Sequence, residues 1–337
     1  MGKNKMGNKK SLIKLHFTNN ESSTPDVSDS FIYKSFCMLY DKVVLDDKNP
    51  DFVILDPFSN EWLKYDCARI FIATEHWFPS TFFSDIMITN RKSKKNDLYY
   101  RSTFFSQELL GFKNGKYKIP KDNFKKQFCC FIYSNKYCKT RNDFFDKMYK
   151  RFGNKFHSWG KYKRNIEKLK MPYGTINSNM SPISIMRGYK FSICFENSSR
   201  YEAFSEKVPN ALLAHSLPIY WGSDSIYKYV KKGTFVNAKD FKNFDELIDY
   251  IEKVDNDDEL YNSYMLDDPF VDSEFIQNQL DLKKFSKLLE NKIQNTNSKK
   301  PFWQTGRVAK ILFKFLYFMY RKYWKFKSLK RRFIGGT

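Results

Sequence analysis

The residue types best suited to chemistry gather in one segment, 189–223, which reads YKFSICFENSSRYEAFSEKVPNALLAHSLPIYWGS. Its apolar first half predicts a strand, which delivers Glu196 and Asn197 to its carboxyl end. The triplet Ser-Glu-Lys at 205–207 then opens a predicted helix, and Ser205 is a favourable N-cap. The sequence therefore predicts a polar site at the point where a strand ends and a helix begins.

A site of this kind suits a phosphorylated nucleotide. A helix N-terminus binds phosphate through its free N–H groups and its dipole, and Lys207 adds a positive charge there. Glu206 is placed to accept hydrogen bonds from ribose hydroxyls, as acidic residues do in nucleotide-binding folds. The next strand leads into a tight turn at 221–223, beside the same position. An ordinary βαβ unit with a capped helix gives the same pattern, so the residues alone leave both interpretations open.

Other kinds of site have no counterpart in the sequence. It contains no Gly-rich dinucleotide loop, no P-loop, no Cys/His metal pattern and no Asp-x-Asp motif at a strand end. We therefore expect no metal, and no cofactor is required. The histidines lack mutual spacing and are expected to be structural: His16, His76, His157 and His215. The cysteines lack metal-like spacing and are expected to be buried, reduced thiols in a reducing cytoplasm: Cys37, Cys67, Cys129, Cys130, Cys138 and Cys194.

Apolar runs of strand length alternate with helical patterns along the chain. Strands are expected at 11–17, 51–56, 68–74, 85–89, 128–134, 189–197, 216–222 and 234–237. Helices are expected at 29–40, 141–151, 206–215 and 244–254. The alternation predicts an α/β protein with two Rossmann-like, doubly wound domains facing each other across a cleft. We expect an N-terminal domain at 1–122, a C-terminal domain at 123–296 and a basic tail at 297–337.

The positive charge of the chain is concentrated in this tail. The net charge is +22, and residues 299–337 contribute twelve Lys or Arg and no Asp or Glu. Apolar and aromatic residues recur at helical spacing over 303–328, but the apolar run 311–320 is too short to span a bilayer. We therefore expect a basic amphipathic helix that binds an anionic membrane surface through residues 303–332. A helix packed on the protein body is the alternative, and a nucleic-acid-binding tail is less favoured.

The start of the chain carries no apolar run long enough for a signal peptide or a membrane span. Met6 stands where a myristoylation signal requires Ser or Thr. With the basic tail, these observations lead us to expect a cytoplasmic protein that is peripheral on the inner face of the membrane.

Residues 189–207, YKFSICFENSSRYEAFSEK, resemble the signature of the α1,3/α1,4-fucosyltransferases, glycosyltransferase family 10. The family pattern is close to Y-K-F-x-x-x-F-E-N-S-x-x-x-x-Y-[IV]-[ST]-E-K. The stretches AHSLPIYWGSDSI and FVNAKDFKNFDELIDYIEKV that follow are similar to the bacterial, Helicobacter-type branch. Weaker similarity is found at 66–89, 128–150 and 158–161, so the resemblance covers roughly residues 50–270.

This resemblance implies a GT-B-like fold and an inverting transfer of L-fucose from GDP-fucose to a hydroxyl of a glycan acceptor. The expected linkage is α1,3 to GlcNAc of an N-acetyllactosamine-type or related surface glycan, such as a Lewis antigen or lipopolysaccharide. Acceptor binding is assigned to the N-terminal domain and GDP-sugar binding to the C-terminal domain. The resemblance implies Glu75 as the catalytic base. It implies donor binding by Arg141, Glu196, Asn197, Tyr201, Glu206 and Lys207.

Within these roles, the resemblance assigns the diphosphate to Arg141 and Lys207, whereas Glu196 either faces the sugar or bonds backbone. One departure from the family pattern is Ala203, which stands where the family carries an aromatic residue. It motivates an alternative, a related transferase that uses another GDP-sugar. A catalytically silent protein that binds glycan or nucleic acid on the same scaffold is the alternative from another class.

Overall fold

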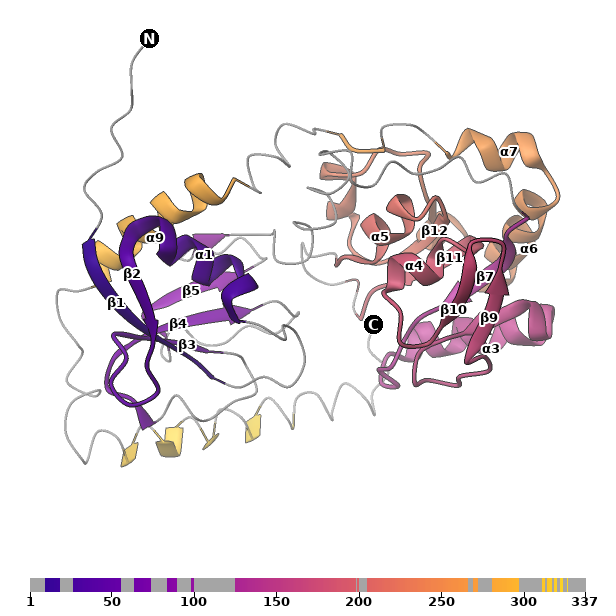
Figure 1. Ribbon diagram of the computed structural model, residues 1–337. Helices are drawn as coiled ribbons and strands as arrows, with labels where there is room; N and C mark the ends of the chain where they lie inside the picture. The colour runs from indigo at the N-terminus through magenta and orange to yellow at the C-terminus, as the bar shows by residue number, and fades with distance from the viewer. Residues whose placement is uncertain are drawn as a thin grey trace, which may run out of the picture. The chain divides into compact units, whose positions relative to one another are not determined.

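The computed structural model divides the chain into two compact units, each built on a parallel sheet (Figure 1). Unit 1 combines Met1–Thr103 with Gln277–Arg331, and unit 2 combines Phe104–Ile276 with Arg332–Thr337. The structure describes residues 10–18, 27–55, 64–73, 84–89, 98–99, 125–197, 199, 205–265, 269–271 and 281–296, and ten residues between 311 and 326.

The sheet of unit 1 has the strand order β2-β1-β3-β4-β5-β6, and all neighbours are parallel. Its strands are β1 (Lys10–Phe17), β2 (Tyr40–Leu45), β3 (Phe52–Leu55), β4 (Ala68–Ala73), β5 (Ile86–Thr89) and β6 (Leu98–Tyr99). The helix α1 (Phe31–Leu39) connects β1 to β2, and the Ser30 side chain caps its N-terminus by accepting from the Tyr33 N–H at 3.1 Å. Alternate residues of β3 face opposite sides of the sheet and are all buried, as expected for a parallel sheet covered on both faces.

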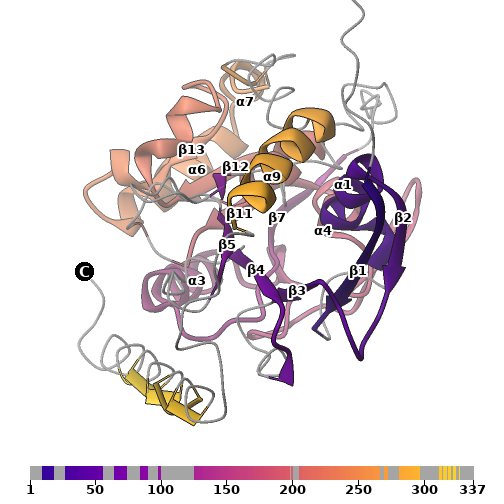
Figure 2. The same ribbon diagram turned by 90° about the vertical axis from the view of Figure 1, so that its left-hand side faces the viewer.

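The helix α9 (Leu282–Thr296) belongs to unit 1, although it comes late in the sequence (Figure 2). Its residues Phe285, Leu289 and Ile293 recur every four positions, so they form one apolar stripe, and they are buried against Ile32 and Phe36 of α1. The sequence analysis ended the C-terminal domain at residue 296 and so assigned 282–296 to that domain, whereas the structure assigns these residues to unit 1. Chain continuity suggested that assignment, whereas the apolar stripe of α9 is buried in the core of unit 1.

The sheet of unit 2 has the order β13-β12-β11-β7-β8 and is also fully parallel. Its strands are β7 (Gln127–Phe131), β8 (Phe156–Ser158), β11 (Tyr189–Phe195), β12 (Leu217–Trp221) and β13 (Val236–Asn237). Its longer helices are α3 (Lys139–Phe152) and α6 (Phe244–Asp255), with shorter α4 (Pro182–Met186), α5 (Lys207–Leu213) and α7 (Asp258–Ser263). A separate antiparallel hairpin is formed by β9 (Lys168–Met171) and β10 (Gly174–Asn177).

The two faces of β11 determine how the helices of unit 2 are layered. Phe191, Ile193 and Phe195 join the core that contains the buried side chains of α3 and α6. The intervening residues point to the other face, where the Cys194 thiol contacts the Lys207 carbonyl at the start of α5. Helices therefore cover both faces of this sheet, and the prediction of an α/β fold with two parallel sheets is confirmed for both units.

Several predicted elements are confirmed with small shifts of their ends, and others were missed. Strand β2 was not predicted because it carries the exposed Asp41 and Lys42 in an edge position. All six cysteines are free, and four of them are buried; Cys37 is exposed and Cys67 is half-buried, so burial was predicted wrongly for these two. Among the helices that the structure describes, none combines the length and the apolar character that crossing a bilayer requires.

Candidate donor-binding site

The candidate site lies at the carboxyl edge of the sheet of unit 2, between β7 and β11. The chain leaves β7 through α3 toward β8 on one side, and leaves β11 through α5 toward β12 on the other. Ligands of doubly wound sheets bind at this topological switch point, outside the carboxyl ends of the strands. Arg141, Asn197 and Lys207 come from the three segments that meet there.

Arg141 is a fully buried cation without a negative partner among the described residues. It lies in the first turn of α3, with 0% of its surface exposed. Its guanidinium donates to the Asn197 side-chain oxygen at 2.8 Å and to the Asn135 carbonyl at 2.6 Å, both neutral acceptors. Its Nε has no hydrogen-bond partner within the described part of the chain. Buried charges are normally paired, so this arrangement favours binding of an anion.

The start of α3 strengthens the same preference. The N-cap Cys138 makes no side-chain capping bond, and the first turn contains no acidic residue. The helix dipole places partial positive charge at the N-terminus of α3. Because Arg141 is also positive, the dipole does not stabilise its buried guanidinium. A phosphate group would compensate both charges at once.

Lys207 is the first residue of α5, and its side chain is 19% exposed. Its ammonium group donates to the Ser205 hydroxyl at 2.7 Å and to Glu196 Oε2 at 3.4 Å, and Glu206 Oε1 lies 3.8 Å away. Burial alone lowers the pKa of Lys207, but the carboxylates of Glu196 and Glu206 more than offset this effect, so the pKa lies above its usual value. Lys207 is therefore positively charged throughout the neutral pH range.

Glu196 is a structural carboxylate in this arrangement, with 1% of its surface exposed. Its Oε1 accepts from the backbone N–H of Ser205 at 2.7 Å and from the Ser205 hydroxyl at 2.8 Å. Of the two roles that the sequence left open for Glu196, this geometry matches the bonding of backbone. Gly222 passes so close that an added Cβ would lie 2.8 Å from Glu196 Cγ and 2.3 Å from the Tyr220 hydroxyl oxygen. The turn at 221–223 therefore requires glycine.

The N-cap of α5 was predicted wrongly. Glu206, not Ser205, is the N-cap residue, and its side chain makes no capping bond. The Ser205 hydroxyl is instead occupied by Glu196 and Lys207. A serine before a helix is a good cap only while no stronger partner competes for its oxygen, and here an ammonium group lies within reach.

Glu196→Gln is expected to shift the alkaline limit of activity to lower pH. The substitution keeps the shape of the side chain and an oxygen that can accept from Ser205, but it removes the nearest negative charge that raises the pKa of Lys207. The lowering effect of burial on the pKa of Lys207 is then offset less, so Lys207 loses its proton at lower pH than in the wild type. A profile of kcat/KM from about pH 7 to about pH 11 measures the shift.

The matched control is Glu206→Gln, because Glu206 is more distant from the ammonium and its side chain is 34% exposed. It should move the alkaline limit less than Glu196→Gln does. Superimposable profiles for Glu196→Gln and the wild type would contradict the assignment of Glu196 as the main counter-charge.

The structure brings together five of the seven residues that the sequence singled out: Arg141, Glu196, Asn197, Glu206 and Lys207. Glu75 and Tyr201 lie outside the described residues, as does Ala203.

The sequence analysis missed two residues of the site. One is Ser205 as a partner of the Lys207 ammonium group. The other is Tyr133, whose ring lies against Arg141 with the guanidinium carbon 4.2 Å from the ring centroid. The feature of the sequence that could have identified Tyr133 is its position just beyond β7, at the carboxyl end of a strand. Among the described residues, no group of three or more His, Cys, Asp or Glu side chains is arranged to hold a metal ion.

The comparisons with known proteins agree in pointing to one family. The family model described as glycosyltransferase family 10 (fucosyltransferase) C-term matches residues 122–296. An alpha-(1,3)-fucosyltransferase of Helicobacter pylori is 36% identical over 180 residues, which are 50% of this chain and 35% of that protein. A 4-galactosyl-N-acetylglucosaminide 3-alpha-L-fucosyltransferase 9 of Mus musculus is 32% identical over 94 residues, 27% of this chain and 26% of that protein. The matched segments therefore span about a third or less of these relatives.

The fold extends the similarity beyond the family segment. A crystal structure of an α1,3-fucosyltransferase with GDP-fucose superposes with a TM-score of 0.60, covering 89% of this chain and 95% of that chain at 21% sequence identity. At this identity the superposition supports the fold alone, and it includes both units. The motif at 189–207, the two parallel sheets and the family model together show that the chain belongs to glycosyltransferase family 10, the fucosyltransferase family.

Proposed function

We propose that this protein transfers L-fucose from GDP-fucose to a hydroxyl of a glycan acceptor. The observation that carries the proposal is the buried, uncompensated guanidinium of Arg141 at the switch point, with the protonated Lys207 nearby. Two cations at this edge of the sheet suit a nucleoside diphosphate. A solved relative with the same fold is described as an α1,3-fucosyltransferase with GDP-fucose, which favours this donor.

The proposed reaction is a single displacement that inverts the anomeric carbon. The acceptor oxygen forms a bond to C1 of fucose, the bond from C1 to the diphosphate oxygen breaks, and GDP leaves with the bonding electrons. Negative charge grows on the diphosphate in the transition state, so fixed cations there lower the barrier. Arg141 offers a planar fork of donors to the diphosphate, and Lys207 offers a point charge.

The remaining roles are assigned by family resemblance. Glu75 takes the proton of the acceptor hydroxyl, and Glu206 and Asn197 hold the ribose. The Glu206 side chain is 34% exposed, and Asn197 is exposed, so both side chains are accessible to a ligand. We assign the acceptor as an N-acetyllactosamine-type glycan fucosylated α1,3 on GlcNAc, as found in Lewis-type surface glycans or lipopolysaccharide.

The decisive experiment incubates the protein with N-acetyllactosamine and a panel of GDP-fucose, GDP-mannose and GDP-glucose. We expect GDP release and product only with GDP-fucose, and linkage analysis should give an α1,3 bond. Transfer of a different sugar would favour the related transferase that Ala203 suggested. No turnover of any donor would contradict an enzymatic function.

We also propose that the tail holds the enzyme on an anionic membrane surface through residues 303–332. The described residues between 311 and 326 are helical and expose large apolar side chains, such as Ile311 at 66%, Phe315 at 58% and Phe326 at 66%. Lys314 and Lys322 are exposed on the same helix. Exposed apolar side chains and cations together suit the boundary between headgroups and acyl chains.

Removal of residues 303–337 is expected to abolish binding to vesicles that contain anionic phosphatidylserine or phosphatidylglycerol, while transfer to soluble acceptor continues. Vesicle co-sedimentation measures binding, and added salt should weaken it, because part of the attraction is electrostatic. Neutral phosphatidylcholine vesicles are the control. Binding of nucleic acid in place of vesicles, with a steep salt dependence, would overturn the membrane assignment.

A further inference from the structure

Tyr133 is a buried aromatic residue that follows β7 at the carboxyl edge of the sheet of unit 2. Its side chain is held in place from β11, because its hydroxyl donates a shared hydrogen bond to the carbonyl oxygens of Ile193 at 2.8 Å and Phe195 at 3.0 Å. Its ring also packs against the ring of Phe131, with 4.4 Å between the ring centroids. These contacts fix the plane and the position of the ring before any ligand binds.

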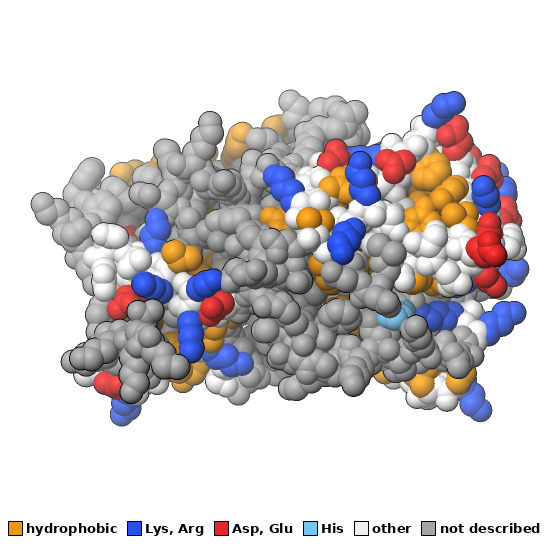
Figure 3. Space-filling view, turned by 90° about the horizontal axis from the view of Figure 1, so that it is seen from above, with side chains coloured by type: hydrophobic (Ala, Val, Ile, Leu, Met, Phe, Trp, Pro, Cys, Tyr) orange, Lys and Arg blue, Asp and Glu red, His pale blue; other side chains and the backbone are white. Residues whose placement is uncertain are grey.

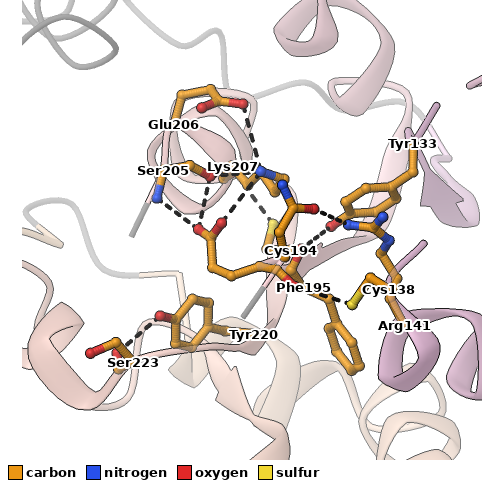
Figure 4. Close-up of polar contacts among 12 residues, drawn as sticks. Tyr133, Cys138, Arg141, Cys194, Phe195, Ser205, Glu206, Lys207, Tyr220 and Ser223 are labelled. Carbon is orange, nitrogen blue, oxygen red and sulfur yellow. Dashed lines mark hydrogen bonds and ion pairs between the residues drawn. The ribbon is translucent and has the colours of Figure 1, made fainter. Parts of the chain in front are cut away.

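The two cations of the donor site share this ring. The guanidinium carbon of Arg141 lies 4.2 Å from the ring centroid, and the ammonium nitrogen of Lys207 lies 6.0 Å from it (Figure 4). Arg141 belongs to α3 and Lys207 to α5, which pack on opposite faces of the sheet. Both distances fall in the range in which a ring attracts a cation through its quadrupole.

An aromatic ring and a carboxylate both attract a cation, but only the neutral ring leaves the positive charge available to bind an anionic ligand. Two cations beside one another repel. Lys207 is held by Ser205 and the nearby carboxylates, whereas the hydrogen bonds of Arg141 go to neutral acceptors, so Arg141 in particular needs a further partner when the site is empty. A carboxylate at this position would pair with Arg141 and compete with an incoming anion. The ring attracts both cations but carries no net charge, so the positive charge of Arg141 remains available.

We propose that Tyr133 is a positioning residue, whose ring fixes the spacing and orientation of Arg141 and Lys207 for the diphosphate of the nucleotide donor without neutralising them. The inference rests on the proposed function, since it takes a nucleoside diphosphate as the ligand. It assigns Tyr133 a role that acts through the two cations, with no contact to the reacting atoms.

The test compares Tyr133→Leu and Tyr133→Phe with a matched control, Phe191→Leu. Phe191 is a fully buried aromatic residue of the same core, and its ring packs against Phe128 and Tyr261. Calorimetry gives the Kd of GDP and of GMP for each variant. We expect Tyr133→Leu to lower the affinity for GDP by about tenfold and to reduce the preference for GDP over GMP. Tyr133→Phe should stay within about threefold of the wild type, because it keeps the ring.

A merely structural role predicts a different pattern. Loss of packing should weaken GDP and GMP binding in parallel, and it should do so equally in Tyr133→Leu and Phe191→Leu. A double-mutant cycle with Arg141→Lys separates the two roles further, because positioning requires the effects of Tyr133→Leu and Arg141→Lys to be non-additive. Tyr133→Ile, with a β-branched side chain suited to the end of a strand, provides the same test if Tyr133→Leu does not fold.

An unchanged ratio of GDP to GMP affinity in a folded Tyr133→Leu or Tyr133→Ile variant would overturn the inference, and so would strictly additive effects in the cycle. Those results would leave the proposed function intact as long as the wild type binds GDP and transfers fucose. A wild-type protein that binds no GDP would instead overturn the proposed function, and this inference with it.

Discussion

Arg141→Met is expected to lower kcat/KM for GDP-fucose by about 10³-fold, because it removes the fixed donor that we propose for the leaving diphosphate. The same change should leave the unliganded protein at least as stable as the wild type. Arg141 is fully buried with only neutral hydrogen-bond partners, so the wild type carries the cost of an unpaired charge that methionine does not. The exposed Asn197 can bond water instead.

Thermal unfolding with and without GDP checks both halves of this prediction. GDP at 100 times its Kd should stabilise the wild type by about 2.7 kcal/mol and the variant far less at the same concentration. Lys147→Met is the matched control, because Lys147 lies on the same helix and is exposed, where it pairs with Asp245. Its activity should stay near that of the wild type. An Arg141→Met variant that keeps its activity, or that unfolds at a much lower temperature, would show that the guanidinium serves the fold.

Glu75→Gln is expected to reduce kcat by about 10²–10⁴-fold with little effect on GDP binding, because it removes the proposed base. Glu75 lies outside the described residues, but it follows the end of β4 at Ala73 by two positions. The carboxyl ends of strands form the ligand-binding edge of such a sheet. Glutamine keeps the size of the side chain and loses only the ability to take a proton.

Steady-state transfer to N-acetyllactosamine and calorimetry with GDP measure these two quantities separately. Asp41→Asn offers a control in the same unit, because Asp41 is an exposed carboxylate on the edge strand β2. It should leave both quantities unchanged. Transfer at the wild-type rate by Glu75→Gln would refute the role of Glu75 as the base.

The parallel sheets were predictable where their strands are buried on both faces. The four residues of β3 are all buried, and runs of this kind differ clearly from their polar surroundings. Strand β2 carries Asp41 and Lys42 at the edge of its sheet, where solvent tolerates polar side chains, so its run is interrupted. The helix α9 was not predicted, and its apolar stripe does not say which unit will cover it.

The site was predictable where chemistry and local sequence coincide. Glu196, Glu206 and Lys207 lie close together in the chain, and the structure places both carboxylates beside the ammonium group of Lys207. The roles of Ser205 and Tyr133 depend on neighbours that only the fold supplies. A tyrosine that ends an apolar run is ordinarily a core residue, and its contact with Arg141 and Lys207 requires helices from both faces of the sheet.

The return of α9 to unit 1 has a consequence for how the chain folds as it is synthesised. The core of unit 2 is built from residues between Cys129 and Val254, so it can close as soon as residues 104–276 have left the ribosome. Unit 1 is discontinuous, and the ring of Phe31 in α1 lacks its partner until Phe285 of α9 has been made. The half of the molecule that begins the chain is therefore the last to complete its core.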